Sequence, residues 1–188
     1  PPRSTLFPYT TLFRSYTFST ENWRRPDGEI NFLFDLIRKS FKKKIKKIIK
    51  QGIKVNIIGE RKGLPKDIVE IVKLIEQKTV KNKKITLNLA LNYGSKEEII
   101  NACKNLALKR NKEISINSFK NELYTKNIPD PEILIRTGGT KRLSNFLLWQ
   151  IAYSEIFFGD QLWPDFKGDD FNKNGNKYFN IKRNFGTI

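Results

Sequence analysis

Histidine and methionine are absent from this sequence of 188 residues, and cysteine occurs once, at Cys103. A single cysteine excludes a disulfide framework within the chain and any zinc site built from several thiolates. The absence of histidine excludes mechanisms that need an imidazole base or ligand. Because methionine is absent, the chain does not begin at a natural start codon, and we expect a fragment, a processed product or an expression product.

Long apolar runs are missing as well. Asp35, Gln150 and Asp160 interrupt the longest ones well short of the roughly 18–20 residues that a membrane span needs, and nothing resembles a secretory signal. We therefore expect a soluble protein of the reducing cytoplasm. The length and the 38% of hydrophobic residues suit one domain with a sizeable core.

Acidic residues are few, since 19 Asp and Glu stand against 36 Lys and Arg, which gives a formal net charge of +17. Such a charge is compatible with a protein that binds nucleic acid. The alternative is that most of the excess is lysine on solvated helix faces. We favour this alternative and expect no nucleic-acid partner, because no RNA- or DNA-binding motif is present and aromatic residues are not interleaved with the basic run.

The first fifteen residues, PPRSTLFPYTTLFRS, repeat STLF and TTLF around Pro8 and Tyr9 and contain no lysine. They show neither helical periodicity nor clean alternation of apolar and polar residues. Such a repeat is typical of a translated cloning or sequencing adapter. We therefore interpret residues 1–15 as a non-native leader and residues 16–188 as the domain, with an ordinary extended arm as the alternative.

From Tyr16 onward the pattern alternates between strands and helices. Apolar residues at spacings of three and four from Ile30 to Ile49 predict a long helix that follows Asp27 and is ended by Gly52. Strands are expected over residues 53–58, 85–91 and 133–135, and residues 146–158 are expected to form a helix and then a strand. This alternation predicts an α/β fold in which helices flank a parallel sheet.

Shorter signals mark the remaining helices. Pro65 is expected to open a helix, and another is expected around residues 119–124. Ser95 and Glu98 have the spacing of a capping box, with Ser95 as the N-cap. Cys103 lies near Ile99 on the face of that helix, and we interpret it as a small core residue.

Two loops concentrate polar groups after expected strands, where open parallel sheets form their sites. The first is FSTENWRRP, residues 18–26, and the second is IRTGGTKRLSNF, residues 135–146. In the second loop, Arg136, Arg142 and Ser144 predict a phosphate or diphosphate site, because guanidinium groups bind phosphoryl oxygens bidentately and a Gly-Gly turn can present backbone N–H groups. A surface salt bridge is the alternative for a single arginine. No Walker motif is present, so nucleotide hydrolysis is not indicated.

Glu155 lies in the apolar run AYSEIFF. Burial of a carboxylate is costly unless the group is paired or binds a metal. With no histidine and no cysteine cluster, the compatible cation is Mg²⁺ bridging phosphate oxygens. A buried Arg–Glu pair is the alternative.

Three motifs together resemble the undecaprenyl diphosphate synthases, the bacterial cis-prenyltransferases. They are FSTENWRRP, ALNYG over residues 90–94 and the stretch over residues 130–166, and the terminal KRNFG over residues 182–186 also resembles the family's tail. The resemblance implies an α/β fold whose sheet and helices enclose a hydrophobic tunnel, and a homodimer. It implies repeated condensation of isopentenyl diphosphate onto farnesyl diphosphate with magnesium. The product, undecaprenyl diphosphate, would serve as a cell-wall lipid carrier and would bring peripheral membrane contact.

The resemblance also implies roles for individual residues. Isopentenyl diphosphate would be held by Arg136, Arg142, Leu143 and Ser144, and magnesium by Glu155. The rest of the substrate site would comprise Phe18, Ser19, Thr20, Glu21, Trp23 and Arg25. Asn22 would accept the proton, with Glu21 as its catalytic neighbour. Arginine and magnesium would stabilise the departing diphosphate, Phe18 or Trp23 would face the allylic cation, and the apolar stripe from Ile30 to Ile48 would form part of the tunnel wall.

Two departures from the family pattern are visible. Thr140 stands where the family usually has an acidic residue. The family's Asp-Gly-Asn-Gly-Arg loop, which supplies an aspartate and a cradle for the allylic diphosphate, should precede FSTENW but does not occur in residues 1–15. We therefore expect a truncated synthase that is inactive as printed. A non-catalytic partner subunit of the same fold is the alternative, and the intact FSTENW argues against it.

Overall fold

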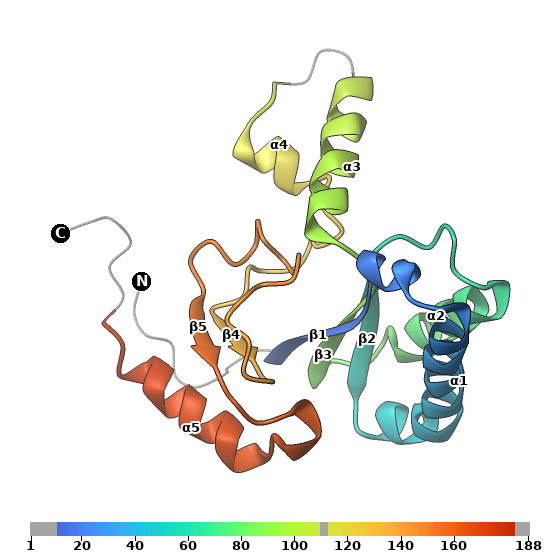
Figure 1. The fold of residues 1–188 in the computed structure, drawn as a ribbon. Helices are drawn as coiled ribbons and strands as arrows, with labels where there is room; N and C mark the ends of the chain where they lie inside the picture. Colours follow the sequence, from blue (N-terminus) through green and yellow to red (C-terminus); the bar gives the residue numbers. More distant parts are fainter. Residues whose placement is uncertain (1–10, 110–112, 183–188) are drawn as a thin grey trace. The chain divides into compact units, whose positions relative to one another are not determined.

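The computed structural model describes residues 11–109 and 113–182. Residues 1–10 of the predicted leader and residues 183–186 of the KRNFG motif lie outside the described residues. The chain divides into two compact units between Lys126 and Asn127. Figure 1 labels the helices and strands of both units. The single domain expected over residues 16–188 stays a prediction. Each unit is described by itself.

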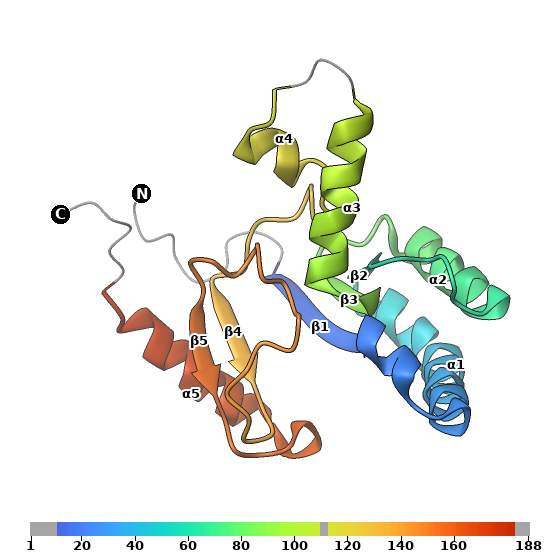
Figure 2. The same ribbon diagram turned by 45° about the horizontal axis from the view of Figure 1, so that its top comes forward.

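The first unit contains a parallel sheet of three strands in the order β1-β3-β2. The strands are β1 (Thr11–Ser19), β2 (Ile53–Ile58) and β3 (Ile85–Tyr93). In the central strand, Ile85 pairs with Thr11 on one side and Ile53 on the other, so the three carboxyl ends share one edge of the sheet (Figure 2). The predicted parallel sheet flanked by helices is confirmed. Residues 11–15 of the predicted leader form part of β1, and the origin of the leader stays a prediction.

The long predicted helix is confirmed as α1 (Asp27–Lys50), with Gly52 at a φ of 70° just beyond its end. The helix opened by Pro65 is α2 (Lys66–Thr79). Apolar side chains of both helices pack with side chains of the sheet into one core, comprising Phe18, Ile30, Phe34, Ile37, Leu64, Ile68, Val72 and Leu91. Packing of these amphipathic helices is what holds the sheet and its carboxyl edge in place.

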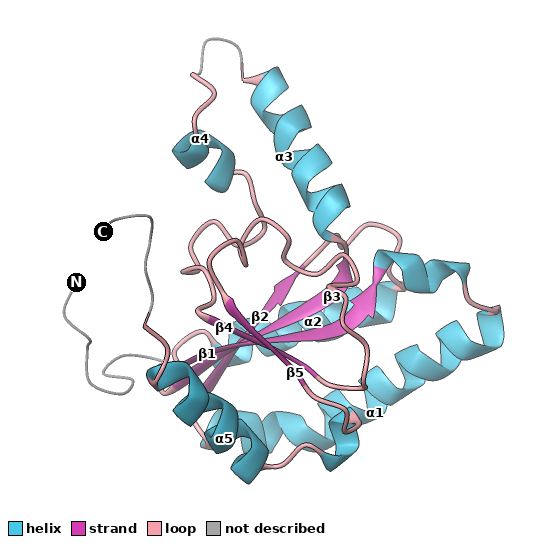
Figure 3. Cartoon of the chain, turned by 60° about the vertical axis from the view of Figure 1, so that its left-hand side comes forward, coloured by secondary structure: helices cyan, strands magenta, loops and turns pink. Residues whose placement is uncertain are grey.

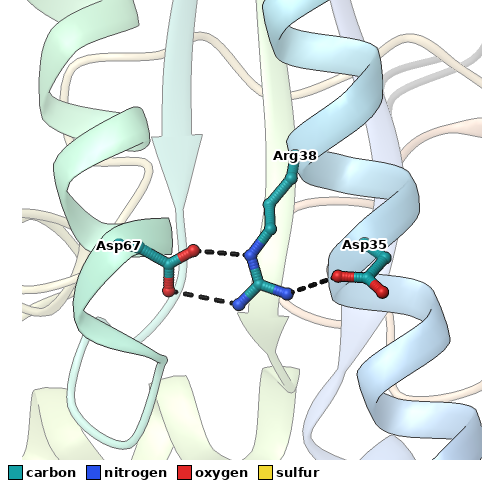
Figure 4. A network of polar contacts seen from close by, with 3 residues as sticks. All are labelled: Asp35, Arg38 and Asp67. Carbon is teal, nitrogen blue, oxygen red and sulfur yellow. Dashed lines mark hydrogen bonds and ion pairs between the residues drawn. The ribbon is translucent and has the colours of Figure 1, made fainter.

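An ion-pair network joins α1 to α2 (Figure 4). Arg38 donates from Nε and Nη2 to the two carboxylate oxygens of Asp67, at 2.5 and 3.1 Å, and from Nη1 to Asp35, at 2.7 Å. The guanidinium of Arg38 lowers the pKa of the Asp67 carboxyl below its usual value. This bidentate contact joins the two helices at their exposed side, whereas the apolar core holds them together.

Three further helical segments complete the first unit: η1 (Thr20–Arg24), α3 (Ser95–Leu108) and α4 (Ile116–Lys120). The predicted cap of α3 is wrong by one residue, because Gly94 is the N-cap and Ser95 already lies in the helix. Glu98 is buried and accepts hydrogen bonds from Tyr93 Oη at 2.5 Å and Tyr124 N at 2.8 Å. The prediction of Cys103 as a core residue is also wrong, because it is exposed.

The second unit holds a parallel pair of short strands, β4 (Ile133–Arg136) and β5 (Glu155–Phe158), followed by η2 (Trp163–Asp165) and α5 (Gly168–Phe179). Figure 3 distinguishes these elements by type. The helix predicted ahead of β5 is wrong, because residues 144–153 form consecutive turns that bury Leu147 and Ile151. Strand β4 is half-buried rather than buried. No helix within residues 11–109 and 113–182 is long and apolar enough to cross a bilayer.

Candidate functional site

A groove of about 360 Å³ opens at the carboxyl edge of the three-stranded sheet. Thr20 follows β1, Glu60 follows β2 and Asn92 lies near the end of β3, so each strand delivers one polar side chain to its wall. Residues from α3 form the opposite wall, namely Lys96, Glu97, Ile100, Asn101 and Lys104. This is the place where parallel sheets bind ligands, and the groove combines cationic, acidic and amide groups.

Asn92 holds the edge together. Its side-chain amide donates to the carbonyl oxygens of Glu60 and Lys62, at 2.9 and 3.1 Å, and its Oδ1 accepts from Trp23 Nε1 at 2.7 Å. The backbone of Asn92 has a φ of 50°, a conformation that Asn tolerates better than most residues. At Gly59 an added Cβ would lie 2.2 Å from the Leu91 carbonyl oxygen, so only glycine permits this close approach.

The loop predicted to carry the chemistry, residues 18–26, contains the short helix η1. Asn22 Oδ1 accepts from the backbone N–H of Ser19 at 2.7 Å, and the Asn22 carbonyl accepts from the N–H of Arg25 at 3.0 Å. Thr20 donates to Glu21 at 3.3 Å, and Arg25 contacts Glu29 at 3.5 Å. The amide of Asn22, the predicted proton acceptor, therefore also closes the turn that presents its neighbours.

Three aromatic rings pack against one another where this loop meets α1. Phe18 lies 5.1 Å from both Trp23 and Phe34, and Trp23 lies 5.6 Å from Phe34, measured between ring centroids. Phe18 is 1% exposed and belongs to the core, whereas Trp23 is 37% exposed. Of the two rings that we expected to face a developing cation, only Trp23 presents a surface in this structure.

In the second unit, Arg136 ends β4 and is held by two hydroxyl groups. Its Nε and Nη2 donate to Thr140 Oγ1 at 3.0 and 2.7 Å, and its Nη1 donates to Ser144 Oγ at 2.9 Å. Two of the predicted diphosphate ligands, Arg136 and Ser144, therefore lie together. Both partners of the guanidinium in this network are neutral, so its positive charge remains available to an anion.

The glycine turn works differently from the prediction. The N–H of Gly138 donates to the Gln161 carbonyl at 2.8 Å, and the N–H of Gly139 donates to the Gly159 carbonyl at 3.0 Å. These groups are therefore engaged, and the expectation that they cradle a phosphate is wrong for this structure. Both glycines have positive φ values, 89° and 70°, so they shape the turn and fasten it to residues 159–161.

Beyond the turn, Arg142 and Ser144 are exposed and Leu143 is half-buried. Among the described residues no side chain forms an ion pair with Arg142. Ser144 and Asn145 have φ values of 49° and 57°, which L residues rarely adopt. Such backbone strain is often found at binding loops, and here it aims the Ser144 hydroxyl at Arg136.

Glu155, the predicted magnesium ligand, starts β5 and is half-buried rather than buried. The register places it beside Ile133, three residues before Arg136. The described ranges contain no group of three or more acidic, histidine or cysteine side chains able to hold a metal. A single carboxylate nevertheless suits Mg²⁺, which is commonly bound by one or two carboxylates with substrate phosphates and water. The donor chemistry therefore fits with Glu155 as one ligand.

The structure thus brings the predicted residues together in two sets, residues 18–25 in the first unit and residues 136–144 in the second. The groove adds Glu60, Asn92, Lys96 and Lys104, which we had not predicted as site residues. Only Asn92 had a signal in the sequence, because it begins the Asn-Tyr-Gly motif at the end of the expected strand. Burial raises the pKa of Tyr16, which donates to the Tyr93 carbonyl beside this edge, to about 12.

Comparison with known proteins supports one family throughout. Residues 9–186 match a family model described as "Putative undecaprenyl diphosphate synthase". The chain is 46% identical over 179 residues to an isoprenyl transferase of Prochlorococcus marinus, covering 92% of this chain and 66% of that protein. It is 42% identical over 180 residues to an isoprenyl transferase of Aquifex pyrophilus, covering 96% of this chain and 77% of that protein.

Solved structures agree. A probable undecaprenyl diphosphate synthase from Campylobacter jejuni superposes with a TM-score of 0.86 at 34% identity, covering 94% of this chain and 84% of that one. Lavandulyl diphosphate synthase from Lavandula x intermedia, in complex with dimethylallyl diphosphate, superposes with a TM-score of 0.89 at 31% identity, covering 94% and 79%.

Proposed function

Because this chain belongs to the undecaprenyl diphosphate synthase family of isoprenyl transferases, we propose that it carries the isopentenyl diphosphate site of a cis-prenyltransferase. The proposed reaction condenses isopentenyl diphosphate units onto farnesyl diphosphate and yields undecaprenyl diphosphate for the cell-wall lipid carrier. The chain spans 66% of the length of its Prochlorococcus relative, so activity, substrates and partners of the whole protein are all part of the proposal.

The observation that carries the proposal is the setting of Arg136. A guanidinium at the end of a strand, bound to Thr140 and Ser144, offers a fixed cation with a hydroxyl beside it. Diphosphate oxygens match this geometry because charge-assisted hydrogen bonds to a planar fork are strong and directional. The exposed Arg142 can approach the same anion, because it follows six residues later in the same loop.

In the proposed reaction, the allylic carbon–oxygen bond breaks and the diphosphate leaves with the electron pair. A new carbon–carbon bond forms to the alkene of isopentenyl diphosphate, and a proton is then lost to Asn22. Magnesium, when bound with Glu155 as ligand, would neutralise charge on the diphosphate. Ser19 and Asn22 fix the loop, Thr20, Glu21 and Arg25 contribute polar contacts, and the exposed part of Trp23 faces the cation.

The groove beside Thr20 offers a second place for a substrate at the carboxyl edge of the first unit, although Glu60 and Glu97 line it together with the lysines, so its charge alone does not select an anion. Lys96 and Lys104 are exposed there and come from α3, whereas Asn92 and Asn101 offer amide groups. The core stripe of α1 remains our proposed tunnel wall, because Ile30, Phe34 and Ile37 line the buried face of that helix. A homodimer and a cytoplasmic location stay predictions.

Calorimetric titration of the chain with isopentenyl diphosphate tests the proposed site. Replacement Arg136→Ala should weaken binding by roughly 10- to 100-fold, as expected for loss of charge-assisted hydrogen bonds. Arg136→Lys keeps the charge but not the fork, and should recover only part of the affinity. Lys173→Ala on α5 removes one charge elsewhere and should bind as the parent does. Equal affinity of the parent and Arg136→Ala would contradict the assignment.

A further inference from the structure

One face of α1 takes no part in the core or in the candidate site. It carries six exposed side chains at alternating spacings of four and three residues, which we call the outer stripe: Phe32, Leu36, Lys39, Lys43, Lys46 and Lys50. Residues at this spacing form one line along a helix, here about 27 Å long at 1.5 Å per residue. Helical geometry places this line opposite the buried Ile30, Phe34 and Ile37.

The outer stripe changes character along the helix. At its start, Phe32 is 62% exposed and Leu36 is 45% exposed. Residues 39–50 then contain seven lysines and no acidic residue. In the part of the chain that the structure describes, none of these lysines forms an ion pair. Two exposed apolar groups are therefore followed by a dense array of uncompensated positive charge.

Two acidic side chains near the apolar end, Glu29 and Asp35, are already paired. Glu29 lies 3.5 Å from Arg25, and Asp35 lies 2.7 Å from Arg38 in the network of Figure 4. Because these carboxylates have cationic partners, they oppose an anionic surface near Phe32 less than free carboxylates would. The outer stripe as a whole offers positive charge together with apolar side chains.

We propose that the outer stripe docks the protein on a bilayer surface that contains anionic lipids. Lysines are attracted to anionic headgroups, and exposed Phe and Leu side chains enter the boundary between headgroups and acyl chains. The choice of a bilayer rests in part on the proposed function, whose product is a lipid. It also rests on the stripe itself, because a bilayer uses both its apolar and its cationic parts.

Other occupants match the outer stripe less well. A second copy of the chain would bring lysines against lysines, which repel. A single-stranded nucleic acid would use the lysines, but no exposed aromatic side chain lies between them for base stacking, and Leu36 would gain nothing. Binding of a single-stranded nucleic acid serves as one outcome of the test.

Flotation of the chain with vesicles gives a direct test. The probes are vesicles of phosphatidylcholine alone and of phosphatidylcholine with phosphatidylglycerol. The triple variant Lys39→Glu, Lys43→Glu and Lys46→Glu should lose on the order of 100-fold in binding to the anionic vesicles, because each lysine near such a surface contributes about fivefold. The control Lys73→Glu, Lys126→Glu and Lys173→Glu makes the same change in net charge at exposed sites outside α1 and should retain most of the binding.

A second variant tests the apolar end without changing charge. Phe32→Asn with Leu36→Asn should weaken binding to anionic vesicles by roughly tenfold or more, because these groups then gain little from entering the lipid. Both α1 variants should keep the helical circular dichroism of the parent and its affinity for isopentenyl diphosphate. Failure of the vesicle test with intact diphosphate binding therefore overturns this proposal alone.

Three results would overturn the docking proposal. The first is equal binding of the parent to both kinds of vesicle. The second is equal loss in the α1 triple variant and its control. The third is binding of a single-stranded RNA oligonucleotide that is tighter than vesicle binding and unaffected by Phe32→Asn with Leu36→Asn.

Discussion

Thr140 Oγ1 accepts two hydrogen bonds from the guanidinium of Arg136, at 3.0 Å from Nε and 2.7 Å from Nη2. A threonine thus occupies the position where the resemblance led us to expect an acid. It orients the guanidinium as a carboxylate would, but it leaves the positive charge of Arg136 uncompensated.

Replacement of Thr140 by valine keeps the shape of the side chain and removes the acceptor. Arg136 then keeps only its bond to Ser144, so the fork is less well oriented. We expect Thr140→Val to weaken isopentenyl diphosphate binding by about 5- to 10-fold, corresponding to about 1 kcal/mol for a lost hydrogen bond. Thr140→Ser retains the hydroxyl that accepts these hydrogen bonds, so its affinity for isopentenyl diphosphate should lie within about twofold of that of the parent. Unchanged binding in Thr140→Val, measured by calorimetry, would show that Thr140 does not position Arg136.

Asn92 should contribute more to stability than a side chain with one hydrogen bond, because it makes three. Asn92→Ala removes two donated bonds and one accepted bond and leaves the Glu60 and Lys62 carbonyls and the Trp23 indole without this partner. We expect the free energy of unfolding to fall by about 2–4 kcal/mol in denaturant titrations. Asn101→Ala, which removes one bond to Tyr124, should cost about 1 kcal/mol. Similar losses in the two variants would argue against Asn92 as the fastening point of the sheet edge.

Tyr16 should make the protein sensitive to alkali. Burial raises its pKa from 10.0 to about 12, so the folded state retains the phenolic proton over a range in which the unfolded chain loses it. The contribution of Tyr16 to stability is therefore present below pH 10.0 and is lost as pH rises through about 12. In urea titrations, Tyr16→Phe should flatten the decline of stability across this interval. Tyr153→Phe, at an exposed site, should decline as the parent does, and the same decline in Tyr16→Phe would contradict the role of burial.

The sequence predicted those helices and strands whose pattern of apolar residues lies within the element itself. The spacing of apolar residues in α1 and the β-branched run of β2 predicted these elements at their observed positions, because an amphipathic helix and a buried strand each carry their periodicity in the chain. Helix α5 was not predicted, because its sequence is polar and contains asparagine and glycine residues of low helix propensity, such as Asn172 and Gly175.

Long-range contacts account for what the sequence could not predict. Nothing within the Gly-Gly turn indicates that its N–H groups bind the carbonyls of Gly159 and Gln161, which lie about twenty residues away. The exposure of Cys103 depends on which elements cover α3, and the burial of Phe18 depends on its contact with Phe34. The sequence could predict that Arg136 and Ser144 lie close together, because both belong to one short segment of the chain.

Glu155 should couple diphosphate binding to magnesium. If its carboxylate is a ligand, removal of Mg²⁺ with a chelator should weaken isopentenyl diphosphate binding in the parent and leave Glu155→Gln nearly unchanged. Glu132→Gln, at an exposed neighbouring position, should respond to the chelator as the parent does. A magnesium response of parental size in Glu155→Gln would show that another group holds the metal.

Turnover of isopentenyl diphosphate with farnesyl diphosphate and Mg²⁺ tests the central claim most directly. The measurement uses radiolabelled isopentenyl diphosphate and the chain carrying the expected Asp-Gly-Asn-Gly-Arg loop ahead of β1. The account predicts long cis-polyprenyl diphosphate products. In the Arg136→Ala variant the rate should fall by at least about 100-fold, which corresponds to a loss of roughly 3 kcal/mol of transition-state stabilisation. Absence of prenyl products, or an unchanged rate in Arg136→Ala, would contradict it.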